Sequence, residues 1–143
     1  MHLYWRLSRG LTLGVRAAVI DERNAVFLVR HSYVKGWHLP GGGVEPGETL
    51  LEALSRELQE EGNITLTQPP ALHGVFFNGR APSRDHVAVF VARHFVQSTP
   101  KARDAEIVET GFFPLDALPA DTSQATRRRL KEIGEGAVIS PLW

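Results

Sequence analysis

Short runs of apolar and β-branched residues recur along the chain, separated by clusters of Gly, Pro, Asp and Asn. The runs at 12–20, 25–29, 75–77 and 87–92 have the length and composition of strands. The turn-like segment 21–24 predicts that the first two runs form a hairpin. A further short strand is predicted at Phe112 and Phe113, after an acidic loop at 101–109.

Two segments show the spacing of an amphipathic helix. The first begins near Gly47, with Thr49 as N-cap and Glu52 completing a capping box, and it ends at Gly62–Asn63. The second is predicted over about 123–133. The order strands, helix, strands, helix predicts an α+β fold, in which a mixed β-sheet lies between helices.

The first helix carries two stripes that lie side by side on a helical wheel. Its leucines fall within an arc of roughly 100° and predict the buried face: Leu50, Leu51, Leu54 and Leu58. Three carboxylates at positions i, i+3 and i+4 fill the adjoining arc: Glu57, Glu60 and Glu61. A solvated acidic face would instead be centred opposite the leucines, where Gln59, Glu52 and Arg56 lie.

Carboxylates crowded against the core margin repel one another and lose hydration, which raises their pKa values unless a cation compensates. A hard divalent cation such as Mg²⁺ resolves this conflict, because it binds carboxylates together with substrate phosphates. The preceding Gly-rich loop lets backbone approach the same point. The wheel therefore predicts a metal site for phosphate chemistry, with a solvated acidic helix as the alternative.

The segment from Gly42 to Ile64 resembles the Nudix box, the signature of the Nudix hydrolase family. Its pattern is Gly, five residues, Glu, seven residues, then Arg-Glu-apolar-x-Glu-Glu-x-Gly-apolar. The matches are Gly42, Glu48, Arg56, Glu57, Leu58, Glu60, Glu61 and Ile64. Asn63 stands where the pattern has Gly, and Asn is the next most tolerant residue for a positive φ. Segment 37–42 is also similar to the strand that enters the box in this family. Segment 106–119 is similar to the family's last strand and the turn that follows it.

The resemblance implies a Nudix-type α/β/α sandwich and assigns roles within it. The implied metal ligands are the carboxylates of Glu57, Glu60 and Glu61, with the carbonyl of Gly41 as a further ligand. The remaining box residues support them: Arg56 orients the catalytic glutamates, while Gly42 and Glu48 stabilise the site. The catalytic base is a box glutamate, such as Glu57 or Glu60, or a loop glutamate, for which Glu106 and Glu109 are the candidates.

The implied reaction is Mg²⁺-dependent hydrolysis of a nucleoside diphosphate linked to another group, with Mn²⁺ able to substitute. A (deoxy)nucleoside triphosphate, cleaved to the monophosphate and pyrophosphate, is the first expected substrate. ADP-ribose or another nucleoside diphosphate sugar is the second. A Nudix-fold module that senses a nucleotide without cleaving it is the alternative from another class. Arg84 and Phe77 are predicted to contact substrate, by meeting a phosphate and by stacking on a base.

Composition narrows the setting of this chemistry. The 143 residues contain 16 Lys plus Arg and 16 Asp plus Glu, a balance that argues against nucleic-acid binding through bulk positive charge. The absence of cysteine excludes disulfides and thiolate metal sites. No apolar run approaches the ~20 residues of a membrane span, so we expect a cytoplasmic protein without a membrane partner. Residues 1–143 are expected to form one Nudix domain, and a homodimer is an open alternative.

Two groups of basic residues are assigned ordinary roles at this stage. The six histidines lie outside any metal-binding spacing and are expected at the surface or in the core. The run Arg127, Arg128 and Arg129 is interpreted as a solvated helix face.

Overall fold

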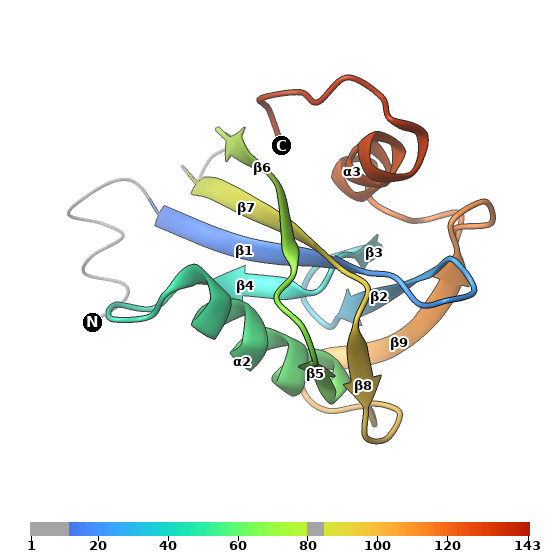
Figure 1. The fold of residues 1–143 in the computed structure, drawn as a ribbon. Coiled ribbons are helices and arrows are strands. Elements are labelled where there is room, and N and C mark those ends of the chain that lie inside the picture. Colours follow the sequence, from blue (N-terminus) through green and yellow to red (C-terminus); the bar gives the residue numbers. More distant parts are fainter. Residues whose placement is uncertain (1–11, 80–84) are drawn as a thin grey trace.

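The fold is described from a computed structural model that covers residues 12–79 and 85–143 (Figure 1). The two helices are α2 (Leu50–Gly62) and α3 (Gln124–Glu135). The strands are β1 (Thr12–Val19), β2 (Ala25–His31), β3 (Trp37–His38), β4 (Gly41–Gly43), β5 (Ile64–Leu66), β6 (Ala71–Asn78), β7 (Asp85–Ala92), β8 (Phe95–Gln97) and β9 (Ile107–Pro114). The helices described are too short or too polar to span a membrane.

The strands form a four-stranded mixed sheet in the order β4-β1-β7-β6, a three-stranded antiparallel sheet in the order β3-β2-β9, and the pair β5-β8. In the mixed sheet β1 runs parallel to β7, whereas the other two pairings are antiparallel. Two core clusters flank these strands: one contains Leu54 and Leu58 of α2, and the other contains Leu130 of α3. The predicted α+β sandwich with a mixed sheet between helices is confirmed.

The predicted hairpin between 12–20 and 25–29 is wrong, because its two strands lie in different sheets. A single isolated bridge joins the two segments, between Ile20 before the turn and Val26 after it. Both edges of β1 are instead taken by β4 and β7. Segment 41–43, which belongs to the Gly-rich loop expected before the first helix, is the short strand β4. The strand around Phe112 begins at Ile107, so Glu109 lies in β9 rather than in a loop.

The helix α2 follows the predicted caps. The hydroxyl of Thr49 accepts the N–H of Glu52, whose side chain accepts the N–H of Thr49 in return. Asn63 ends the helix in the left-handed conformation, with φ 54° and ψ 36°. One residue of the predicted buried stripe differs: Leu51 is exposed, and Ala53 fills the interior in its place. Leu51 lies in the first turn of α2.

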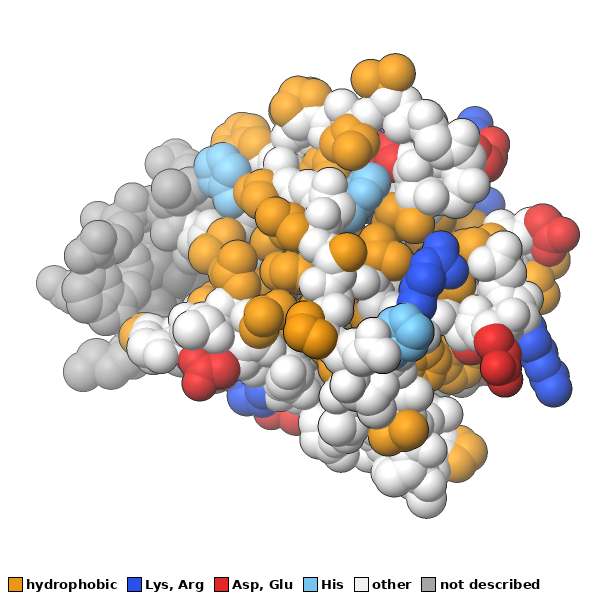
Figure 2. All heavy atoms as spheres, in the orientation of Figure 1, with side chains coloured by type: hydrophobic (Ala, Val, Ile, Leu, Met, Phe, Trp, Pro, Cys, Tyr) orange, Lys and Arg blue, Asp and Glu red, His pale blue; other side chains and the backbone are white. Residues whose placement is uncertain are grey.

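The basic run of α3 is only partly solvated, which corrects its interpretation as an exposed face. Arg129 is fully buried, with its guanidinium 3.8 Å from the centre of the Phe76 ring and hydrogen-bonded to Glu132. It also donates to the carbonyl of Leu142 and so holds the C-terminal segment against the sheet. Figure 2 shows hydrophobic side chains gathered over β6 and β7 on the face drawn; on β6 the exposed ones are Leu72, Val75 and Phe77.

Candidate active site

The C-terminal half of α2 lies directly against the glycines of β4. A Cβ atom on Gly42 would overlap the carboxylate of Glu57, and one on Gly41 would overlap the carbonyl oxygen of Val15. The N–H of Gly41 donates to Glu61 Oε1 at 3.1 Å. Glycine is therefore required at both positions, because only a bare backbone lets the sheet and the two carboxylates meet.

The three box carboxylates are buried to very different degrees. Glu61 is 3% exposed, the Glu57 side chain is 12% exposed and the Glu60 side chain is 59% exposed. The exposure of the three carboxylates follows the helical wheel. Glu61 lies within the apolar stripe, whereas Glu60 lies outside it. The carboxyl groups of Glu57 and Glu61 are close enough for each to influence the protonation of the other.

Burial shifts the protonation of the inner pair. Loss of hydration, opposed by the hydrogen bond from the Gly41 N–H and by the charge of Arg16 and aided by the charge of Glu57, raises the pKa of Glu61 to about 8. Burial also raises the pKa of Glu57, although the hydrogen bond from Arg56 opposes this. Two neighbouring buried carboxyl groups are stabilised when one of them keeps a proton or when a cation binds beside them.

Arg56 connects the helix to the loop that precedes it. Its Nε and Nη2 donate to the carboxylate of Glu48 at 2.8 Å each, and its Nη1 donates to Glu57 Oε1 at 2.8 Å. Nη2 also donates to the carbonyl of Gly43. The two hydrogen bonds with Glu48 raise the pKa of Arg56 most, so the guanidinium stays charged. Arg56 thereby fixes the orientation of Glu57, and Glu48 in turn fixes Arg56.

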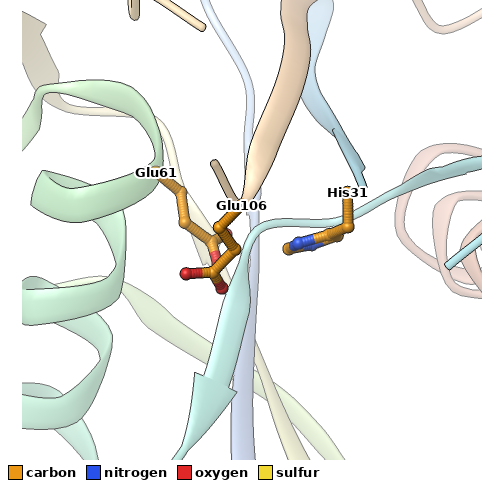
Figure 3. A group of neighbouring side chains, drawn as sticks. All are labelled: His31, Glu61 and Glu106. Carbon is orange, nitrogen blue, oxygen red and sulfur yellow. The ribbon is translucent and has the colours of Figure 1, made fainter. Parts of the chain in front are cut away.

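The structure separates the two loop glutamates that the sequence left as alternatives. Glu106 lies in the turn before β9 and shares a cluster with Glu61 and His31, in which one ligand atom from each lies within 4.8 Å of the others (Figure 3). Glu109 pairs with Arg30 at 3.5 Å. Strand alternation places Glu109 on the face of β9 opposite Phe112, which packs on the α2 side. Glu109 is therefore not brought together with the box carboxylates.

Two cavities open on either side of the β1–β4 pair. One, of about 390 Å³, is lined by Gly42, Gly43 and Glu57. The other, of about 550 Å³, is lined by Gly41, by the aromatic residues Tyr33 and Trp143, and by the first turn of α3. Both volumes fall in the range of small-molecule sites. Arg16 lines both cavities, and its Nη1 donates to the carbonyl of Leu39 at 2.7 Å.

Of the two residues predicted to contact substrate, the structure describes Phe77. Phe77 is 40% exposed and its ring lies 5.3 Å from that of His86, while its neighbour Asn78 lines the larger cavity. Arg84 lies outside the described residues.

Arg16 and His31 belong to the site although sequence reasoning did not select them. Arg16 is a single cation within an otherwise apolar strand, a signal that would have marked it as functional rather than incidental. His31 carries no such signal, because its proximity to Glu61 arises from strand pairing. Burial, followed by the charge of Arg16 and by His38, lowers the pKa of His31 to about 4.

The donor set fits a divalent cation. The Glu57 carboxylate lies against Gly42 and Glu61 Oε1 accepts the N–H of Gly41, so both acids lie beside the bare backbone of β4, while the adjacent Glu60 is exposed. Hard cations such as Mg²⁺ prefer such oxygen donors, and a cation replaces the proton that the inner pair otherwise needs.

Comparison with known proteins agrees with this geometry. The family model described as NUDIX domain matches residues 10–132. The mouse 8-oxo-dGDP phosphatase NUDT18 is 33% identical over 134 residues, which cover 90% of this chain and 40% of the relative. A putative 8-oxo-dGTP diphosphatase of Bacillus subtilis is 44% identical over 50 residues, covering 35% of this chain and 34% of the relative.

A solved structure of similar size shares the fold. The MutT NUDIX hydrolase from Burkholderia pseudomallei superposes with a TM-score of 0.75 and 26% identity, covering 86% of this chain and 98% of that chain. In contrast, this chain spans only about 40% of the length of the mouse protein.

Proposed function

This chain belongs to the Nudix hydrolase family, and from that premise we propose that it hydrolyses nucleoside triphosphates to the monophosphate and pyrophosphate with Mg²⁺ as its cofactor. The family acts on phosphoric anhydrides, so the reaction class is that of a pyrophosphohydrolase. The observation that carries the proposal is the meeting of Glu57 and Glu61 against the glycines of β4, with Arg56 fixing Glu57.

The proposed centre divides its work among a few residues. Glu57, Glu60 and Glu61 would hold Mg²⁺, with the carbonyl of Gly41 as a further donor. When bound, Mg²⁺ neutralises charge on the diphosphate oxygens and lowers the pKa of bound water. Arg56 and Glu48 keep the carboxylates in place as charge develops on the substrate.

A carboxylate at this centre accepts the proton of the attacking water. Glu60 and Glu106 are both exposed. Glu60 precedes Glu61 in α2, and Glu106 belongs to the same cluster as Glu61. Variants Glu60→Gln and Glu106→Gln separate them, because loss of the base removes the acid limb of the pH–rate profile. Loss of a metal ligand would instead raise the Mg²⁺ concentration needed for half-maximal activity.

The larger cavity is our candidate nucleoside site. It adjoins Gly41 and Arg16, and its aromatic lining from Tyr33 and Trp143 offers faces on which a base can stack. Arg16 faces the centre from this side and would meet a phosphate. The cavity would also accept a nucleoside diphosphate sugar, so such compounds belong in the assay.

The test is a substrate panel with products separated by chromatography. We expect Mg²⁺-dependent release of pyrophosphate from nucleoside triphosphates. Oxidised guanine deoxynucleotides should be assayed first, because the names of two relatives specify them. Chelation with EDTA should abolish turnover, and ADP-ribose serves as the nucleotide-sugar comparison. Binding of nucleotide without cleavage at saturating Mg²⁺ would instead indicate a sensing module.

A further inference from the structure

One cluster at the edge of this centre has a composition that Mg²⁺ chemistry does not explain. It joins an imidazole, His31, to two carboxylates, Glu61 and Glu106, and the three side chains come from three different elements. Figure 3 shows Glu61 on the helix and Glu106 beside it, with the ring of His31 facing them across the end of the sheet. A nitrogen donor at this centre favours a cation other than Mg²⁺.

The backbone directs His31 into this position. Phe27 and Val29 of β2 face the core beneath α2, and strand alternation places His31 on the same face. The β2–β9 ladder shifts register between Arg30 and His31, and His31 then pairs with Ile107. Irregularities of this kind re-aim side chains next to functional sites.

The turn that carries Glu106 is held by several hydrogen bonds. The N–H of Ser32 donates to the carbonyl of Glu106 at 2.9 Å, which ties the turn to the residue after His31. Asp104 Oδ1 accepts the N–H groups of Glu106 and Ile107 at 2.9 and 2.6 Å. The backbone of Glu106 is therefore held next to β2 by its bond to Ser32 and by the Asp104 carboxylate.

The imidazole is also short of a partner. Nδ1 of His31 is buried and makes no hydrogen bond to any residue in the described ranges. Buried polar atoms in folded proteins are nearly always satisfied, so such an atom calls for a ligand. The ring centres of Tyr33 and His38 lie 5.3 and 6.2 Å from that of His31.

We propose that His31, Glu61 and Glu106 form a second cation position, which takes a first-row transition metal such as Mn²⁺, Co²⁺ or Zn²⁺ in preference to Mg²⁺. This deepens the proposed function and rests on it for the role of Glu61, which the two positions share. Imidazole nitrogen suits these metals, whereas Mg²⁺ keeps oxygen ligands and its own waters. One protein nitrogen and two carboxylates leave coordination positions open for water or a substrate oxygen.

The probe is Mn²⁺ added to the metal-free chain of residues 1–143, observed by pulsed electron paramagnetic resonance. A directly bound imidazole produces ¹⁴N modulation of the Mn²⁺ signal. We expect this modulation in the unmodified protein and its loss in His31→Gln. The matched control is His38→Gln, which removes the neighbouring ring and should retain the modulation. A hundredfold excess of Mg²⁺ should displace Mn²⁺ from carboxylate positions while the ¹⁴N-coupled fraction persists.

The outcomes separate this inference from the proposed function. Absence of ¹⁴N modulation at full Mn²⁺ occupancy, or its persistence in folded His31→Gln, overturns the inference even if Mg²⁺-dependent hydrolysis is observed. Modulation that depends on His31 in a protein without hydrolase activity supports the cation position and rejects the function. Circular dichroism of each variant verifies folding, and Glu106→Gln, which should reduce the ¹⁴N-coupled fraction at least tenfold, provides a second variant.

Discussion

At the scale of single residues, the box carboxylates are distinguished by their surroundings rather than by their chemistry. Glu61 is sealed between α2 and β4, whereas Glu60 faces solvent one position away. The 100° turn between successive helical residues produces this difference, so neighbours in sequence receive unlike environments. Substitutions at these positions should therefore report on separate parts of the proposed mechanism.

Replacing Glu61 or Glu60 with Gln should lower Mg²⁺-dependent turnover by about 100-fold or more, because each variant loses a carboxylate that would hold the cation at the reacting phosphate. Initial rates at saturating Mg²⁺ measure the effect, and circular dichroism verifies the fold. Glu135→Gln, at the exposed end of α3, is the control for loss of an acidic group. Wild-type rates in both site variants would refute the assignment.

Glu106 and Glu109 provide a matched pair only three residues apart. Glu106→Gln should reduce kcat by about 100-fold, because the variant loses a carboxylate beside Glu61 in either of its proposed roles, proton acceptor or cation ligand. Glu109→Gln should remain within about twofold of the unmodified protein, because it loses only an exposed pair with Arg30. Steady-state kinetics on both variants decide the matter, and equal losses would contradict the placement of Glu109 away from the centre.

At the scale of elements, α2 is determined almost entirely by local sequence. The Thr49 capping box and the Asn63 stop are visible as short patterns, and the structure confirms both. Hydrogen bonds between residues three or four apart need no distant partner. Strand pairing has no such local code, and this is why the hairpin prediction failed while the strands themselves were recognised.

The departure of Asn63 from the Nudix pattern gives a test at this scale. Asn63→Ala should destabilise the fold by about 1 kcal/mol, because Ala adopts the left-handed conformation at a cost that Asn and Gly largely avoid. Asn63→Gly should change stability by less than about 0.5 kcal/mol. It relieves the backbone while losing the hydrogen bonds to Thr99. Urea unfolding measures both, and an Ala variant as stable as the Gly variant would argue against this view.

At the scale of the whole molecule, the site is a place where the fold tolerates unfavourable burial. Helix α2 packs against β4 at the inner carboxyl pair, and the same burial that raises the pKa values of Glu57 and Glu61 favours a cation there. Stability and metal binding are consequently linked through Glu61.

Metal-free protein should lose stability as pH rises from 6.5 to 8. The folded-state pKa of Glu61 is about 8 against a reference of 4.5, so the folded state retains a proton that the unfolded state has released. Stability then falls with pH, by at most about 1.4 kcal/mol per pH unit for one proton. The lowered pKa of His31 acts in the opposite sense, but only below about pH 6.5.

Thermal unfolding in EDTA across this window measures the effect. Glu61→Gln should flatten the dependence, because glutamine does not titrate, and added Mg²⁺ should offset it by binding the ionised form. A melting temperature that rises between pH 6.5 and 8 in EDTA would contradict the buried state of Glu61.

The sequence by itself determined the helix α2, its caps, the crowding of three carboxylates at the core margin, and the family. These features depend on periodicity and on spacings within about twenty residues. The tertiary structure alone decided that Glu106 rather than Glu109 joins Glu61, and that His31 and Arg16 face the same centre. Those contacts depend on the register between strands far apart in the chain. A shift of one residue turns a strand's side chains to the other face, and no local pattern fixes it.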